Sequence, residues 1–332
     1  MKDSVLKNIL VNTRALFRRN ISKEINGLKK RVLELESRLA QMEQNSDIVA
    51  RNSFCYLTTL QYFAQNNAGS AFYAAEIDYL KKLGHFCNFP YPSESSSFQN
   101  EAGFDSEAGL PFVVHDGKKM YFPSTYTVED AIRQYNHLVR VEKILEKEDG
   151  TPAPHCYQSE RGRLCGDDVL FDIGSAEGLF ALHHVDKVKH IVLVECDSLW
   201  HDCLRRTFAP YCDKVDLVAK ALGVEDGGDC ISLPSLLATR ASDNVFVKMD
   251  IEGGEISALL ASEHYLKSCH GKVKLSVAAY HKQNDADMLE EVFKRMGFYS
   301  EFSKGYMLFN DYDMPLPPYF RHGIIRAVNI GQ

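Results

Sequence analysis

The sequence has no pair of cysteines spaced C-x-x-C, although it contains nine cysteines in 332 residues. Their scatter through apolar segments is typical of reduced thiols that pack as small hydrophobic side chains. We therefore expect neither a disulfide framework nor a zinc site. The sequence also lacks a signal-peptide core at its N-terminus and an apolar run of membrane-spanning length. These absences predict a cytoplasmic protein with no membrane span.

Positive charge is not in excess, because 38 Lys and Arg residues stand against 45 Asp and Glu residues, a formal net charge of −7. Binding to a phosphate backbone needs a basic face, so nucleic acid is not the expected partner. The hydrophobic content of 45% and the charged content of 25% are those of an ordinary globular protein. The length suits one large domain with additions, or two domains.

The N-terminal region, residues 1–46, has two helical patterns. Residues 1–20 are basic and amphipathic, which fits either a helix on a membrane surface or a polar-faced helix that leads into the next segment. Residues 21–44 carry a short heptad repeat. Its a positions are Ile25, Val32 and Leu39, and its d positions are Leu28, Leu35 and Met42. Branched residues at a with leucine at d favour a parallel pair of helices, so we expect a homodimer through 21–44. A helix that lies on its own domain is the alternative.

The stretch Val169–Leu182 organises the rest of the chain. Residues 169–173 form an apolar run typical of a buried parallel strand, and Gly174 and Gly178 then bracket a turn before a helical pattern. This strand–turn–helix unit directs backbone N–H groups at a ligand, and we expect glycine there for the turn or for close approach of that ligand. A plain connection is the alternative. A second buried strand ends in Glu195, about 20 residues after the turn, where a carboxylate accepts from ribose hydroxyls.

The remaining pattern predicts an accessory region over 47–160 and a sheet domain over 161–332. The accessory region contains a β-hairpin within 111–123 and a helix from Thr127 to about Glu148. The expected strands of the sheet domain are 169–173, 190–195, 214–219, 245–250 and 273–279, followed by a hairpin of 298–303 and 306–309 around Lys304-Gly305. Alternation with helices predicts an α/β, Rossmann-like sandwich with a mainly parallel seven-stranded sheet and a terminal antiparallel hairpin.

Several motifs resemble the FkbM family of class I S-adenosylmethionine-dependent methyltransferases, over roughly residues 165–310. They are Phe171-Asp-Ile-Gly-Ser-Ala-Glu-Gly178, Val194-Glu195, Ala221-Leu-Gly-Val-Glu-Asp-Gly227, Val247-Lys-Met-Asp-Ile-Glu-Gly-Gly-Glu255, Ala279-Tyr-His281 and Gly297-Phe-Tyr. Ser175 departs from the commoner alanine. The resemblance implies S-adenosylmethionine as cofactor and methyl transfer, most often to a hydroxyl of a sugar, a glycan or another natural product.

Four residues are the catalytic candidates. Asp250 and His281 end neighbouring strands at the edge where open α/β sheets bind ligands, and the ordinary pKa of histidine near 6.5 suits a general base. Lys248 points to the same side of the sheet as Asp250, either in catalysis or as the partner of a carboxylate. Glu252 lies in the turn that follows. We expect no metal, although Asp250, Glu252 and His281 also suit a divalent cation.

The cofactor candidates gather around the glycine turn and the next strands. They are Asp172, Gly174, Ser175, Glu177, Gly178, Glu195, Glu225, Asp226 and Asp250. A solvated turn is the alternative for the loop that contains Glu225 and Asp226. Two other functions remain open: a nicotinamide-dependent oxidoreductase, and a coiled-coil assembly protein whose methyltransferase-like domain only binds a ligand.

Overall fold

The computed structural model describes residues 29–31, 45–92, 101–142, 151–241, 243–269, 271–310 and 315–329. The chain divides into two units, residues 1–57 and 58–332. In the first unit, residues 29–31 and those from 45 onward are helical. The amphipathic segment 1–20 and nearly all of the heptad segment 21–44 lie outside the described residues, so the coiled-coil dimer stays a prediction. Among the described helices, none combines the length and the apolar character that crossing a membrane requires.

The described residues of the second unit form a seven-stranded sheet in the order β11-β14-β10-β9-β4-β5-β6. Strands β10, β9, β4, β5 and β6 are parallel, and β14 runs antiparallel to both of its neighbours. The bounds are β4 Asp168–Ile173, β5 His190–Val194, β6 Val215–Val218, β9 Asn244–Met249, β10 Val273–Ala278, β11 Phe298–Phe302 and β14 Ile324–Asn329. This strand order confirms the predicted fold, a Rossmann-like class I methyltransferase sandwich.

The terminal hairpin is composed differently from the prediction. Strand β11 pairs with β14 and not with the segment after Lys304-Gly305. That segment contributes the short β12 (Met307–Leu308), which pairs with β13 (Phe320–Arg321) in a separate two-stranded sheet. β11 is therefore the edge strand, and it is joined to the rest of the main sheet by β14, which follows it by more than twenty residues.

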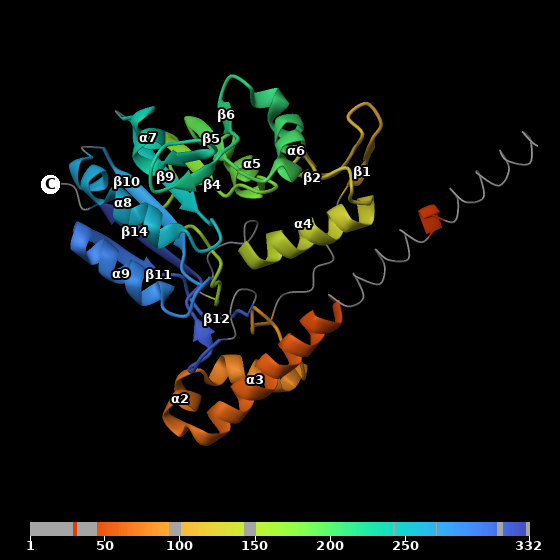
Figure 1. Cartoon of the computed structure of the whole chain (residues 1–332), viewed down its shortest axis with the longest axis vertical. Helices are drawn as coiled ribbons and strands as arrows, with labels where there is room; N and C mark the ends of the chain where they lie inside the picture. The colour runs from red at the N-terminus through yellow and green to blue at the C-terminus, as the bar shows by residue number, and fades with distance from the viewer. Residues whose placement is uncertain are drawn as a thin grey trace, which may run out of the picture. The chain divides into compact units, whose positions relative to one another are not determined.

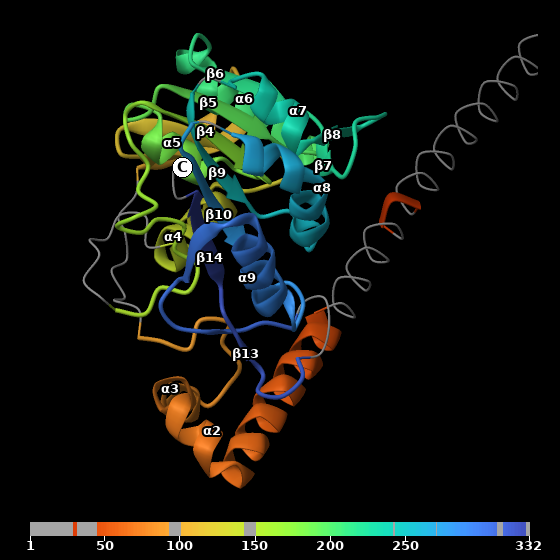
Figure 2. The same cartoon turned by 90° about the vertical axis from the view of Figure 1, so that its left-hand side faces the viewer.

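Helices cover both faces of the main sheet (Figures 1 and 2). The bounds are α5 Leu179–His184, α6 Ser198–Phe208, α7 Leu233–Ala238, α8 Glu255–Ser268 and α9 Asp285–Met296. Helices α7, α8 and α9 pack on one face, where Phe171 and Val247 belong to the core. Helices α5 and α6 pack on the other face, with Leu170 and Phe246. Because strand side chains alternate, Asp172 and Lys248 point to the α5–α6 face.

The accessory segment packs on the same α5–α6 face. The predicted hairpin around Asp116-Gly117 is confirmed, and a third strand extends it. The strands are β1 Ala102–Asp105, β2 Leu110–His115 and β3 Lys118–Tyr121. Helix α4 (Val128–Glu142) begins as predicted at Thr127, whose hydroxyl accepts from the Asp130 N–H while Asp130 accepts from the Thr127 N–H. Tyr135 and Val139 of α4 enter the core beside Leu170.

The remaining described elements are short. They are helices α2 Asn67–Phe72 and α3 Ala74–Leu83, the 3₁₀ turn η1 Ala209–Tyr211, and the paired strands β7 Ala221–Gly223 and β8 Cys230–Ser232. All nine cysteines fall within the described residues and are free thiols, as the sequence predicts.

Candidate functional site

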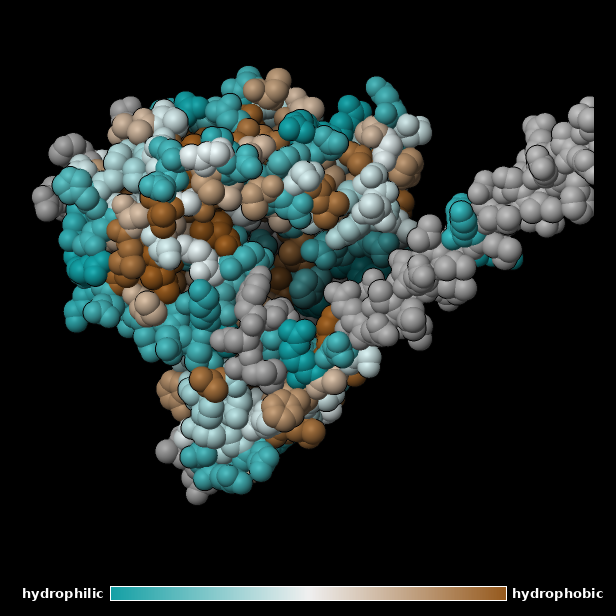
Figure 3. Space-filling model, in the orientation of Figure 1, coloured by the Kyte–Doolittle hydropathy of each residue, from teal (hydrophilic) through white to brown (hydrophobic). Residues whose placement is uncertain are grey.

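The carboxyl ends of the parallel strands form one continuous edge. The Asp250 N–H, just beyond β9, donates to the Ile173 carbonyl of β4 at 3.0 Å. The Glu195 N–H, just beyond β5, donates to the Val218 carbonyl of β6 at 3.1 Å. Residues that follow different strands are thereby fixed next to one another, at the edge where open α/β sheets bind ligands. Beside α4 the surface is hollowed, as Figure 3 shows.

The glycine turn is shaped by the protein's own backbone. A Cβ on Gly174 would lie 1.9 Å from the Asp250 carbonyl oxygen, and the φ angle of Gly174 is +71°. A Cβ on Gly178 would meet side chains of α6, Leu204 and Phe208, at 2.8 and 2.9 Å. The expected tight turn is present. However, the close approach that demands glycine at 174 is that of strand β9's end rather than that of a ligand.

Glu195 is fastened to this turn. One carboxylate oxygen accepts from the Ala176 N–H at 2.8 Å, and the other accepts from the Asp197 N–H at 2.7 Å. The side chain is buried. Each carboxylate oxygen has a second acceptor site, so Glu195 retains capacity for hydroxyl donors. The two regions that the sequence predicted as a cofactor site are therefore in direct contact.

Lys248 is the ionic partner of Asp172. These residues face each other in the β4–β9 register, and the ammonium lies 2.9 Å from Asp172 Oδ1 and 3.0 Å from the Gly174 carbonyl. Burial acts to lower the pKa of Lys248, but the charges of Asp172 and Asp250 raise it above its ordinary value. The structure therefore favours the partner role for Lys248. Among the described residues, Asp172 Oδ2 has no hydrogen-bond partner.

Two further buried carboxyl groups adjoin this pair. Burial raises the pKa of Glu177, in the turn, to about 7. Burial also raises the pKa of Glu142 well above its ordinary value, and the charge of Glu177 adds to the rise. Glu142 Oε2 has no hydrogen-bond partner in the described part of the chain. Glu142 ends α4 and was not predicted as a site residue, since its sequence context is that of an amphipathic helix.

Asp250 lies at the centre of a hydrogen-bonded cluster. Its Oδ2 accepts from Tyr157 Oη at 2.8 Å and from Tyr280 Oη at 3.0 Å, and His155 Nε2 is 3.5 Å away. Burial acts to raise the pKa of Asp250, but hydrogen bonds from His155 and His281 hold it well below its usual range. Asp250 is therefore an ionised acceptor at every physiological pH.

His281 is enclosed by carboxylates. Its Nε2 lies 3.3 Å from Asp250 Oδ1, and its Nδ1 lies 3.2 Å from Glu255 Oε1. Burial acts to lower the pKa of His281, but hydrogen bonds to Asp250 and Glu255 raise it to about 10. The expectation of an ordinary pKa near 6.5 is therefore wrong. At neutral pH the ring is an imidazolium, which cannot accept a proton.

Glu252 and Glu255 take different places. Glu252 is in the left-handed region with φ +63°, and its carboxylate, 3.5 Å from His281 Nε2, belongs to a side chain that is 69% exposed. Glu255 is buried and accepts from the Ile251 N–H at 2.8 Å while it faces His281. Glu255, in the first turn of α8, therefore holds His281.

Asp250, Glu255 and His281 present ligand atoms within 4.8 Å of one another, which is a possible arrangement for a cation. A protonated imidazole is not a metal ligand, and its single positive charge offsets one of the two carboxylate charges. In the ligand-free protein the three residues form an ion-paired cluster.

The loop with Glu225 and Asp226 is held by α7. Asp226 accepts from the Ser232 N–H at 2.7 Å and from Ser235 Oγ at 2.5 Å, at the first turn of that helix. Both acidic residues are exposed. These contacts support the solvated-turn alternative for Asp226, and a role for either residue at a cofactor stays a prediction.

Three solved structures illustrate what the chain is similar to. The methyltransferase FkbM from Methylobacillus flagellatus KT is 19% identical, with a TM-score of 0.40, and the match covers 62% of this chain and 56% of that one. A precorrin-6y C5,15-methyltransferase from Geobacter metallireducens GS-15 is 20% identical, with a TM-score of 0.34 and coverage of 50% and 82%. A putative RNA methyltransferase from Pyrococcus horikoshii is 16% identical, with a TM-score of 0.30 and coverage of 49% and 74%.

No protein-family model matches the sequence, and no curated protein matches it. The fold assignment therefore depends on the strand order described above.

Proposed function

We propose that this protein is an S-adenosylmethionine-dependent methyltransferase. The observation that supports it best is the sign of the charge around the glycine turn. Asp172, Glu177, Glu195 and Glu142 are all buried there, whereas Lys248 is committed to Asp172. A site with surplus buried carboxyl groups favours a cationic ligand.

The charge argument separates the two enzyme hypotheses. S-adenosylmethionine carries a sulfonium and an ammonium against one carboxylate, so its net charge is positive. A nicotinamide dinucleotide places a pyrophosphate at the glycine turn, where backbone N–H groups and a helix N-terminus normally receive it. Here the buried Glu177 lies in that turn, and α5 has only six residues. Repulsion between pyrophosphate and the Glu177 carboxylate argues against the oxidoreductase.

The proposed cofactor contacts follow from the residues at the turn. Glu195 would accept from ribose hydroxyls, and the acidic groups of Glu177, Glu142 and Asp172 would face the cationic end. Ser175 lies in the same turn, with its N–H donated to the Val194 carbonyl at 3.2 Å and its hydroxyl oxygen buried. When bound, the cofactor supplies a methyl group on a positively charged sulfur.

Asp250 is the proposed orienting group for the acceptor. Its fixed carboxylate, held by Tyr157, Tyr280 and His281, can accept a hydrogen bond from an acceptor hydroxyl and position its oxygen. A hydroxyl oxygen becomes strongly acidic as it is alkylated, so even a carboxylate of low pKa can take its proton. His281 then acts as a fixed positive charge that keeps Asp250 in place, and Glu252 borders the opening.

We propose a hydroxyl of a sugar, a glycan or a small natural product as the acceptor. Support comes from the family resemblance of the Lys248–Glu255 segment and from a site whose polar groups are acceptors and hydroxyls. A homodimer through residues 21–44 in the cytoplasm remains part of the proposal. A ligand-binding assembly protein is the alternative, and detection of methyl transfer excludes it.

Calorimetry tests the cofactor. S-adenosylmethionine should bind and NAD should not. Because Glu177 has a pKa of about 7 and a cation favours its ionised form, binding at pH 7 should release about half a proton. Titrations in buffers of different ionisation enthalpy measure this release. Glu177→Gln should lower the release by this half proton, while Glu291→Gln, at an exposed position of α9, should not change it. Tight binding of NAD, or proton uptake with S-adenosylmethionine, would contradict the proposal.

A further inference from the structure

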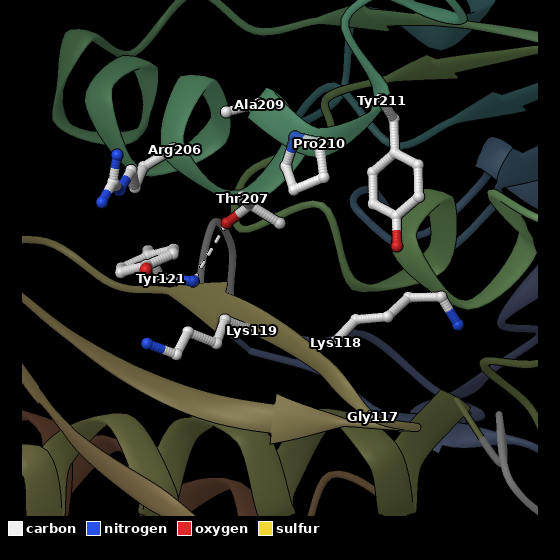
Figure 4. Close-up of a pocket in the computed structure, with 9 residues that line it drawn as sticks. All are labelled: Gly117, Lys118, Lys119, Tyr121, Arg206, Thr207, Ala209, Pro210 and Tyr211. Carbon is white, nitrogen blue, oxygen red and sulfur yellow. Dashed lines mark hydrogen bonds between the residues drawn. The ribbon is translucent and has the colours of Figure 1, made fainter.

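A cavity lies between the accessory hairpin and the end of α6. Its volume is about 400 Å³, within the range of sites for small ligands. Figure 4 shows Lys118 and Lys119 of β3 on one side, and Arg206 of α6 with Pro210 and Tyr211 of η1 on the other. The Tyr211 ring projects from η1 toward the Lys118 side chain (Figure 4).

This cavity is separate from the carboxylate site. Helix α6 begins at Ser198, just beyond the strand end that carries Glu195, and it ends at Phe208, where η1 begins. The glycine turn adjoins the last turns of α6, because Gly178 lies against Leu204 and Phe208. None of the buried carboxylates Asp172, Glu177, Glu195 and Asp250 lines the cavity, however, so the cavity is formed by a different set of residues from the carboxylate site.

Two of the three cations retain hydrogen-bond donors. Asp105 lies beside them, but it already accepts from the Ala108 N–H at 3.1 Å and from Tyr121 Oη at 2.8 Å. Lys119 Nζ and Arg206 Nη2 are 3.8 and 3.6 Å from Asp105 Oδ2, beyond hydrogen-bond distance. An ammonium has three donors and a guanidinium has five, so both side chains can serve an additional acceptor.

Lys118 is engaged more firmly. Its ammonium lies 2.8 Å from Asp186, whose side chain is 63% exposed, and 4.0 Å from Asp116. Together with Asp105, these carboxylates equal the three cations in number. Binding of an anion would therefore depend on the unused donors of Lys119 and Arg206, and not on an excess of positive charge.

We propose that this cavity binds a small organic anion, a carboxylate or phosphate group on a body the size of one sugar ring. Lys119 and Arg206 donate to the anionic group. Pro210 and the ring of Tyr211 provide an apolar wall for the carbon framework. The site adds a binding function that is independent of the proposed methyl transfer.

Calorimetry at low salt, without S-adenosylmethionine, tests the proposal. The probes are D-glucuronate and glucose 1-phosphate. D-Glucose is the control for a sugar ring without charge, and inorganic phosphate is the control for an anion without a sugar ring. Both sugar anions should bind, more tightly than phosphate, and glucose should not. Arg206→Ala and Lys119→Gln should each weaken binding about tenfold or more, the effect of a lost charge-assisted hydrogen bond.

Arg205→Ala is the matched control, because Arg205 is the neighbouring residue on α6 and its own partner, Asp202, is outside the cavity. This variant should bind like the wild type. Lys119 has an exposed side chain, so its replacement keeps the test valid even if Arg206→Ala fails to fold. Equal losses in Arg205→Ala and Lys119→Gln, glucose binding as tightly as glucuronate, or no binding of either sugar anion would overturn the proposal.

Discussion

Replacing His281 by glutamine should destabilise the protein in a way that depends on pH. The pKa of His281 is about 10 in the folded protein and about 6.5 in an unfolded chain. That difference corresponds to roughly 4–5 kcal/mol of stabilisation. Because folding raises this pKa, the stabilisation is present in full below about pH 6.5. It is lost as the pH rises toward 10, at about 1.4 kcal/mol per pH unit. The same ion pair depresses the pKa of Asp250, so this energy is counted once.

Urea denaturation of the wild type and of His281→Gln between pH 6 and 9.5 measures the effect. At pH 6 the variant should be less stable by about 3–5 kcal/mol, the usual cost of leaving buried carboxylates without their cation. The difference should shrink steadily as the pH rises. His264→Gln, at an exposed position of α8, serves as the control. A stability difference that does not change with pH would show that His281 is neutral in the folded protein and would restore its candidacy as a base.

Three other predictions concern the cofactor, the turn and assembly. Glu195→Ala should weaken S-adenosylmethionine binding by about 1–3 kcal/mol in calorimetry, the effect of unpaired ribose hydroxyls, and unchanged affinity would remove Glu195 from the site. Gly174→Ala should lower the free energy of unfolding by more than about 3 kcal/mol, because its Cβ would overlap the Asp250 carbonyl, whereas Gly227→Ala, which meets nothing within 4 Å, serves as the control. Removing residues 1–46 should give a monomer in sedimentation that still transfers methyl groups; a truncated dimer would place the interface elsewhere.

The parallel strands could be predicted from the sequence because each is a short apolar run bounded by turn residues. The partner of β11 could not. Lys304-Gly305 is a good local turn signal, and reading it as a hairpin placed 306–309 beside β11. The structure places 324–329 there instead. Pairing between distant segments depends on tertiary packing, which a local pattern does not contain.

The site residues also divide into those that the sequence could predict and those that it could not. Asp172, Lys248 and Asp250 were identified because they belong to strand ends, where topology fixes their position. Tyr157 was not identified as a site residue, since it reaches Asp250 from 93 residues earlier in the chain. The pKa of His281 could not be foreseen either, because it depends on two carboxylates that only folding brings together.

The position of β14 has a consequence for biosynthesis. Its residues, Ile324–Asn329, lie between β10 and β11 in space but follow both in the chain. A ribosome therefore releases six strands of the main sheet before the one that joins β11 to the others. Until then the edge of β10 has no partner strand, and an unpaired apolar strand edge is prone to mispairing. A stop codon shortly before residue 324 would remove the sheet's connecting strand and detach β11, although every candidate site residue would already have been translated.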